Sequence, residues 1–249
     1  MSEKPVRSTD MVKASRQELA PPAEISKFDI GAITMWFGTR DLVEDDLATF
    51  NFELNFRSFP LYSTFAIPDA AKVKGGAYPA FFPIDRDIEH ELGMLKERPI
   101  AIFIIGTQEL SEYSWFNQLP RGIMEFRSNQ GRANSTFVYR VFLDWGFSQE
   151  GPDDPQGRFS KRETRAHQLD GVFIPYSHDY RSLGIRRTIE FMSRVMGCDL
   201  PGEKFPNYTT DEVQKIAWNI NREDFNAFSP REGAIPKYPI INGEPQFPF

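Results

Sequence analysis

FNFELNFR, at residues 50–57, alternates apolar and polar side chains without exception. In an extended chain this period of two places the three phenylalanine rings and Leu54 on one face and the polar side chains on the other. A strand with one apolar face is buried on one side only, and such strands occur mainly in antiparallel sheets. The stretch therefore predicts a half-buried strand within an antiparallel sheet.

Two other segments have the pattern of buried strands. Residues 100–105, IAIFII, form the longest apolar run and end at Gly106, which favours a fully buried strand. Residues 135–145, STFVYRVFLDW, are largely apolar on both faces, as expected of a central strand that is covered on two sides. β-branched and aromatic residues predict four more strands, at 28–37, 61–67, 122–127 and 171–176.

Turn-forming residues refine this set of strands. SNQGRAN, at residues 128–134, predicts a hairpin between the strands at 122–127 and 135–145. Pro175 has no backbone N–H to donate, so it is expected either in an edge strand or at the terminus of the strand at 171–176.

Three helices are predicted. The first covers residues 85–97 and precedes the buried strand. The second runs from Asp179 to about residue 196, where Gly197 has the position of a C-terminal cap. A third begins at Thr209, because Glu212 completes a capping box with it.

These elements predict an α+β fold. We expect a mostly antiparallel sheet of roughly five to seven strands, one inserted helix, two C-terminal helices and extended arms at both termini. The pattern is also compatible with closure of the sheet into a jelly roll or a barrel.

Composition narrows the classes of protein. The net charge of -6 argues against a surface built as a whole to neutralise phosphates. A single cysteine, Cys198, cannot form an internal disulfide, and residues 1–27 contain no apolar leader segment, so we expect a cytoplasmic protein or a virion component assembled in the cytoplasm. No apolar run approaches the roughly 18 residues of a spanning helix, so no membrane insertion is expected.

The chain divides into three predicted parts. Residues 1–27 are a flexible polar arm, residues 28–223 are a single globular domain, and residues 224–249 are an extended arm rich in proline and aromatic residues. The C-terminal arm is too apolar for a freely solvated tail. It either wraps its own domain or reaches a neighbouring subunit, in which case its aromatic residues are the expected anchors. These anchors are Phe225, Phe228, Tyr238, Phe247 and Phe249.

Residues 156–200 hold eight basic and five acidic side chains, so this stretch is net positive. A functional patch for phosphate, nucleic acid or an acidic partner is one interpretation. The alternative is a solvated helix face with internal pairing, since Glu190 lies four residues from both Arg186 and Arg194. The candidate patch residues are Arg158, Lys161, Arg162, Arg165, Arg186 and Arg187.

Catalytic and cofactor motifs are absent from the sequence. His90, His167 and His178 are far apart and Cys198 is alone, so no metal is expected. The sequence lacks glycine-rich phosphate loops and a nucleophile elbow, so we expect no cofactor and favour a protein that is not an enzyme.

Three functional hypotheses follow. The first is a structural or assembly subunit of a larger complex, for example of a viral or phage particle, which contacts other subunits through its arms. The second is a nucleic-acid or phosphate-binding module that uses residues 158–194, with Phe159, Tyr176 and Tyr180 available for stacking. The third is an enzyme whose site forms only in the folded chain, around His178, Asp179 and Tyr180.

Overall fold

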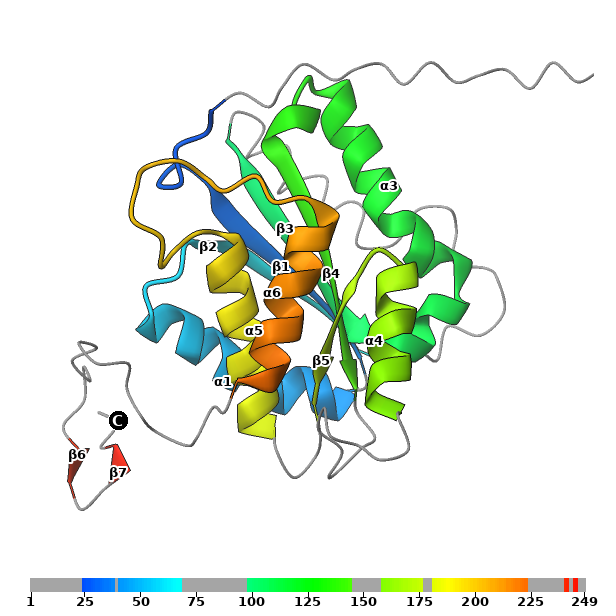
Figure 1. Cartoon of the computed structure of the whole chain (residues 1–249), viewed down its shortest axis with the longest axis vertical. Coiled ribbons are helices and arrows are strands. Elements are labelled where there is room, and N and C mark those ends of the chain that lie inside the picture. Colours follow the sequence, from blue (N-terminus) through cyan, green and yellow to red (C-terminus); the bar gives the residue numbers. More distant parts are fainter. Residues whose placement is uncertain are drawn as a thin grey trace, which may run out of the picture.

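The computed structural model describes residues 24–38, 40–68, 98–144, 158–176, 181–223, 240–241 and 244–245. Its centre is one sheet of five parallel strands in the order β2-β1-β3-β4-β5 (Figure 1). These strands are β1 (Gly31–Gly38), β2 (Leu61–Pro68), β3 (Ile100–Thr107), β4 (Thr136–Asp144) and β5 (Val172–Pro175).

Helices follow the strands in the manner of an α/β protein. The α-helices are α1 (Arg40–Phe56), α3 (Ser114–Asn129), α4 (Arg158–Gln168), α5 (Arg181–Val195) and α6 (Thr210–Arg222). Two short 3₁₀ helices are η2 (Gln108–Glu112) and η3 (Ala133–Ser135). A separate antiparallel pair is formed by β6 (Ile240–Ile241) and β7 (Glu244–Pro245).

Helices cover both faces of the sheet (Figure 1). α1, α5 and α6 pack on the face that contains Trp36, whereas α3 and α4 pack on the face that contains Phe37. Neighbouring residues of a strand point to opposite faces, so β1 supplies one aromatic ring to each core. Coverage on two sides explains why Ile100–Ile105 of β3 are apolar and buried throughout.

The predicted antiparallel sheet is wrong, and so is a jelly roll or a barrel, because every pairing within the five-stranded sheet is parallel. The decisive error concerns residues 50–57, of which 50–56 form the end of α1 and Arg57 the turn that follows it, rather than a strand. Phe50 and Leu54, one helical turn apart, are fully buried, while Phe52 is 41% exposed. The burial follows the helical period, and the alternation of apolar and polar residues is incidental to it.

The predicted hairpin at 122–135 is wrong for a related reason. Residues 122–127 belong to α3, in which Ile123 and Arg127 are buried one turn apart. The Arg127 guanidinium donates from Nε to Thr136 Oγ1 at 2.9 Å and from another nitrogen to the Arg98 carbonyl at 2.8 Å. These bonds hold the end of α3 against the start of β4, and burial lowers the pKa of Arg127.

Other local predictions are confirmed. The strands at 28–37, 61–67, 100–105, 135–145 and 171–176 correspond to β1 to β5, and β5 is an edge strand as Pro175 indicated. α5 ends in a Schellman motif, with Gly197 at φ +68° and bonds from the 197 and 198 amides to the 194 and 193 carbonyls. Thr209 and Glu212 form the predicted capping box of α6.

Several predictions fall on residues outside the described ranges. These are the helix at 85–97, residues 1–23 of the N-terminal arm, and the C-terminal arm apart from residues 240–241 and 244–245. At the described end of the N-terminal arm, Ser26 forms an antiparallel bridge with Lys204. Within the described ranges, no helix is both long and apolar enough to cross a membrane.

Candidate functional site

The edge of the sheet beside β4 is only partly occupied. β4 pairs with β3 from Thr136 to Leu143, but it pairs with β5 only from Val141 to Asp144. Among the described residues, no strand pairs with Thr136–Arg140 on the β5 side, and we call this segment the open edge. In Figure 1, β4 extends beyond β5 at the end of the molecule where α6 begins.

The turn between α4 and β5 explains why β5 begins late. Asp170 has φ +52°, and the Asp170 and Gly171 amides bond to the His167 and Ala166 carbonyls, so α4 ends in a Schellman motif. Gly171 then lies flush against β4, because a Cβ at this position would be 2.4 Å from the Phe142 ring. Asp170 therefore occupies a left-handed conformation that glycine adopts with less strain.

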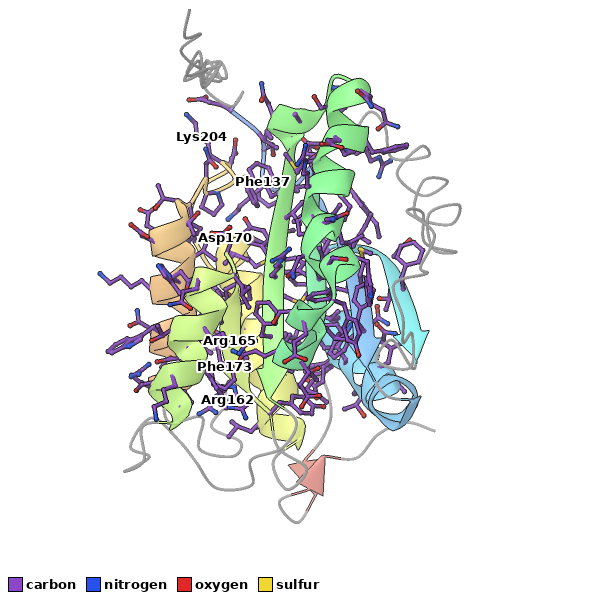
Figure 2. The ribbon with its side chains drawn as sticks, turned by 90° about the vertical axis from the view of Figure 1, so that its right-hand side faces the viewer. Phe137, Arg162, Arg165, Asp170, Phe173 and Lys204 are labelled. Atoms are coloured by element: carbon purple, nitrogen blue, oxygen red, sulfur yellow. The ribbon has the colours of Figure 1, made fainter. Side chains whose placement is uncertain are left out.

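A pocket of about 240 Å³ lies along the open edge. Its wall on the β4 side is Thr136–Arg140, and its other walls are residues 170–172 and the region where α6 begins. The α6 region contributes Tyr208, Thr210, Val213 and Gln214. Figure 2 labels Phe137 and Asp170, which lie at the same end of the molecule and both line the pocket.

Tyr139 is one of two tyrosines that line this pocket. Its ring stacks on Phe103 at 5.1 Å and meets Phe191 edge-on at 6.4 Å, and the residue is 9% exposed. No residue of the described chain forms a hydrogen bond with its hydroxyl. Burial and then the nearby Tyr208 raise the pKa of Tyr139, so the phenol stays protonated at neutral pH.

The second phenol of the pocket, Tyr208, has a raised pKa because of burial and then the charge of Glu212. The Glu212 carboxylate accepts from the Thr209 amide at 2.8 Å and the Thr209 hydroxyl at 2.9 Å, and these bonds lower its pKa. The carboxylate of the capping box therefore lies close enough to act on the Tyr208 phenol.

Arg140 points to the opposite face of the sheet from Tyr139. It donates to the Leu169 carbonyl at 2.8 Å and the Asn117 carbonyl at 2.6 Å, while its buried Nε has no partner in the described part of the chain. Burial lowers the pKa of Arg140 and the charge of Asp170 opposes that shift. Two of its three nitrogens are thus already committed to the fold.

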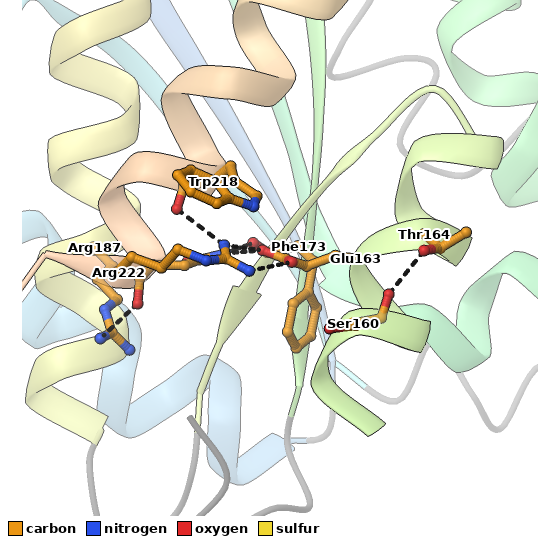
Figure 3. A network of polar contacts seen from close by, with 8 residues as sticks. Ser160, Glu163, Thr164, Phe173, Arg187, Trp218 and Arg222 are labelled. Atoms are coloured by element: carbon orange, nitrogen blue, oxygen red, sulfur yellow. Dashed lines mark hydrogen bonds and ion pairs between the residues drawn. The ribbon is translucent and has the colours of Figure 1, made fainter. Parts of the chain in front are cut away.

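The outer edge of β5, in contrast, is closed by α6. Gln214 Nε2 donates to the Gly171 carbonyl at 2.6 Å, and Asn221 Nδ2 donates to the Phe173 carbonyl at 2.8 Å. Figure 3 shows the network around the second contact, in which Arg222 of α6 pairs with Glu163 of α4 at 2.9 Å. Arg187 of α5 donates to the Asn221 carbonyl at 3.3 Å, so three helices meet at this edge.

The structure divides the predicted basic patch between two layers. Lys161, Arg162 and Arg165 lie on α4, on one face of the sheet, and Figure 2 labels the two arginines there. Arg186 and Arg187 lie on α5, on the other face, where Arg187 contacts α6. The side chain of Arg158 is outside the described set.

Other side chains of this region form ion pairs or are buried. Arg194 bonds to Glu190 at 2.8 Å, as predicted, and also to Glu223 at 2.6 Å. Phe159 is 3% and Tyr176 1% exposed, so the prediction that they stack on nucleic-acid bases is wrong. The described residues contain no cluster of three metal-ligating side chains.

Cys198 has no reactive character at neutral pH. Partial burial and then the charge of Asp199 raise the pKa of its thiol to about 11, and a protonated thiol is a weak nucleophile.

The remaining predicted site residues lie outside the described ranges. They are the anchors Phe225, Phe228, Tyr238, Phe247 and Phe249, and the residues His178, Asp179 and Tyr180 of the enzyme hypothesis.

Sequence reasoning missed the pocket residues, although one signal pointed to them. The predicted strand at 135–145 is much longer than the one at 171–176. If two neighbouring strands differ in length, the longer one has backbone groups that the shorter one cannot pair. The missing information was that these two strands are neighbours in the sheet.

No protein-family model matches this chain, and no curated protein matches it.

Proposed function

We propose that this protein is an interaction component of a larger complex, and that it binds an extended segment of a partner protein along the open edge. The observation that supports this most directly is that the segment Thr136–Arg140, unpaired on one side in the described chain, opens into the pocket. Strand addition to a free sheet edge is a common mode of peptide recognition.

Backbone chemistry explains why a peptide suits this edge. A strand presents alternating N–H and C=O groups, and buried groups of this kind are nearly always paired in native proteins. An extended peptide about 4.8 Å away offers complementary groups at the same repeat. Thr136 is 5% and Tyr139 9% exposed, whereas Phe137, Val138 and Arg140 are half-buried.

A selection experiment tests the proposal. Short random peptides displayed on phage are selected on the full chain and then measured on two variants, Thr210→Trp and Lys215→Trp. Thr210 lines the pocket and is exposed on α6, so a tryptophan there fills the pocket without disturbing the core. Lys215 is also exposed on α6 but does not line the pocket, and it is the matched control. We expect binding to be lost in the first variant and kept in the second.

Amide hydrogen exchange identifies the mode of binding. Strand addition predicts that amides within residues 136–140 become protected when a selected peptide binds. Equal binding by the Thr210→Trp variant, or protection elsewhere, would contradict the proposal. If these amides are already protected in the free full chain and lose protection when residues 1–23 or 224–249 are deleted, the edge belongs to the chain's own segment. Protection that depends on protein concentration would assign the edge to a second copy of the chain.

An assembly role for the predicted aromatic arm is part of the same proposal. Deleting residues 224–249 and measuring the native mass in extracts tests it. Loss of the complex with retained folding supports an arm that contacts a neighbour, and loss of folding supports a tail that wraps its own domain.

A second candidate is an anion site at the carboxyl ends of the strands. In doubly wound sheets ligands bind at this end, where α4 and α5 begin with Arg158 and Arg181 and have no acidic residue in their first turns. Positive side chains at a helix start add to the positive end of the dipole, which an anion would offset. Retention on heparin that falls with salt, and falls further in Arg158→Gln, supports this candidate. Passage through heparin at low salt would remove it.

A further inference from the structure

We propose that the partner segment carries a cationic side chain, lysine or arginine, which enters the pocket between Asp170 and the phenols of Tyr139 and Tyr208. This inference rests on the strand addition proposed above and names the chemistry that the site selects.

The pocket offers acceptors to a hydrogen-bond donor. The Tyr139 hydroxyl has no partner in the described chain, and the Tyr208 and Thr210 hydroxyls line the same space. Gln214 donates its amide hydrogen to the Gly171 carbonyl, which leaves its oxygen as an acceptor. A lysine ammonium supplies three donors and needs acceptors only, so it matches these groups.

Two charged residues of the described chain line the pocket, Asp170 and Arg140. Asp170 is exposed and lines the pocket. Glu212 on the first turn of α6 acts on Tyr208 strongly enough to raise the pKa of that phenol, after burial. The exposed Asp170 carboxylate attracts a cation and repels a carboxylate.

The positive charges of Arg140 and Lys215 would oppose an incoming cation if they were directed at the same group. Arg140 lines the pocket, but it already donates to two carbonyls from the other face of the sheet and lies beside Asp170. Lys215 is exposed on α6 and does not line the pocket. Neither ammonium nor guanidinium is therefore directed at the Tyr139 hydroxyl.

The backbone of Asp170 gives independent support. A non-glycine residue in the left-handed region carries a conformational cost, and such residues concentrate at binding sites. Glycine would relieve that cost at this turn but would remove the only carboxylate among the described residues that line the pocket. The strained aspartate is explained if its charge contacts a ligand.

The test uses a host peptide, acetyl-Ser-Val-Ser-Xaa-Ser-Val-Ser-amide, in which Xaa is lysine, norleucine, glutamine or glutamate. Each peptide is titrated into the isotope-labelled full chain while the amides of residues 136–140 are followed by NMR. We expect lysine to bind about tenfold more tightly than norleucine, the effect of one charge-assisted hydrogen bond. Glutamate is expected to bind most weakly.

Variants then assign the preference to the pocket. Asp170→Asn should reduce the preference for lysine over norleucine to about threefold or less, and Tyr139→Phe should weaken the lysine peptide alone. Asp211→Asn is the matched control, because Asp211 is exposed on α6 and does not line the pocket. It should leave the preference unchanged.

The outcomes separate this inference from the proposal on which it rests. If norleucine or glutamate binds as well as lysine while the 136–140 amides respond, the cationic side chain is wrong and strand addition stands. If the lysine preference survives in Asp170→Asn, the preference arises elsewhere and the inference fails. If no peptide affects these amides, and the phage-selected peptides do not either, strand addition itself is wrong.

Discussion

One edge of the sheet is covered by a helix along β5 and is open along Thr136–Arg140 of β4. Along β5, α6 supplies the side-chain amides of Gln214 and Asn221 to the carbonyls of Gly171 and Phe173. Along Thr136–Arg140 of β4, the described chain supplies no strand, and a pocket lies there instead. An unprotected sheet edge is a liability that proteins normally cover. The same helix covers one half and borders an opening at the other, which is why we place the binding function at the opening.

The largest effect on stability is expected when a hydrogen bond between α6 and β5 is removed. Asn221 is 1% exposed, and its Nδ2 donates to the Phe173 carbonyl at 2.8 Å. Asn221→Ala removes this donor. We expect a loss of about 2 kcal/mol in the free energy of unfolding, because a buried acceptor is left unpaired. The loss is partly offset because the buried Oδ1 of Asn221, which has no partner in the described chain, is removed as well.

Urea denaturation measures this loss. Asn219→Ala, an exposed asparagine on the same helix, is the control and should change stability by less than about 0.5 kcal/mol. Equal effects of the two substitutions would show that the amide of Asn221 does not close the β5 edge.

A smaller effect is expected where the two halves meet. Gln214 bonds to the Gly171 carbonyl and also lines the pocket. Gln214→Ala should cost about 1 kcal/mol of stability and, if the pocket binds a cation, weaken the lysine peptide. Unfolding and peptide titration of the same variant check both results. A change in stability with unaltered lysine binding would limit Gln214 to the closed half.

The open half should respond in the opposite direction. Asp170→Gly relieves the left-handed backbone at φ +52° and should stabilise the protein by roughly 0.5 kcal/mol, the strain relieved less the entropy that glycine adds to the unfolded chain. The same change should weaken the lysine peptide. Thermal unfolding and titration measure the two effects, and a destabilised variant would contradict the argument from strain.

The smallest expected effect is a change in how stability depends on pH. Hydrogen bonds from Thr209 lower the pKa of Glu212 in the folded chain from its ordinary value of 4.5. The folded state therefore gains stability from this group above pH 4.5, and loses it as the pH falls through the lowered pKa. Glu212→Gln should flatten this part of the stability curve, measured by denaturation between neutral and acid pH. An unchanged acid limb would show that the capping bond contributes little.

Short-range patterns were read correctly where one element decides the outcome. The capping box at Thr209 and Glu212 and the glycine at 197 act within one turn of a helix, so neighbouring residues specify them. The apolar run at 100–105 is a strand because six successive buried residues suit a parallel sheet covered on both faces.

Residues 50–57 show where a local pattern is insufficient. Their alternation fits a strand, but Phe50 and Leu54 also lie one helical turn apart and both face the core, where Phe50 meets Trp36 at 4.6 Å. Contacts with β1 decide between the two periods, and these contacts join residues that are distant in the sequence.

The sequence by itself indicated the positions of the five strands of the sheet, together with two false strands at 50–57 and 122–127. It also indicated the caps of α5 and α6 and the unequal lengths of the segments that became β4 and β5. Only the tertiary structure decided that the sheet is parallel, that β4 and β5 are neighbours, and that Tyr139, Asp170 and Tyr208 share one pocket. The physical reason is that caps and strand propensity depend on adjacent residues, whereas strand order depends on which apolar faces pack together after the chain has crossed the sheet.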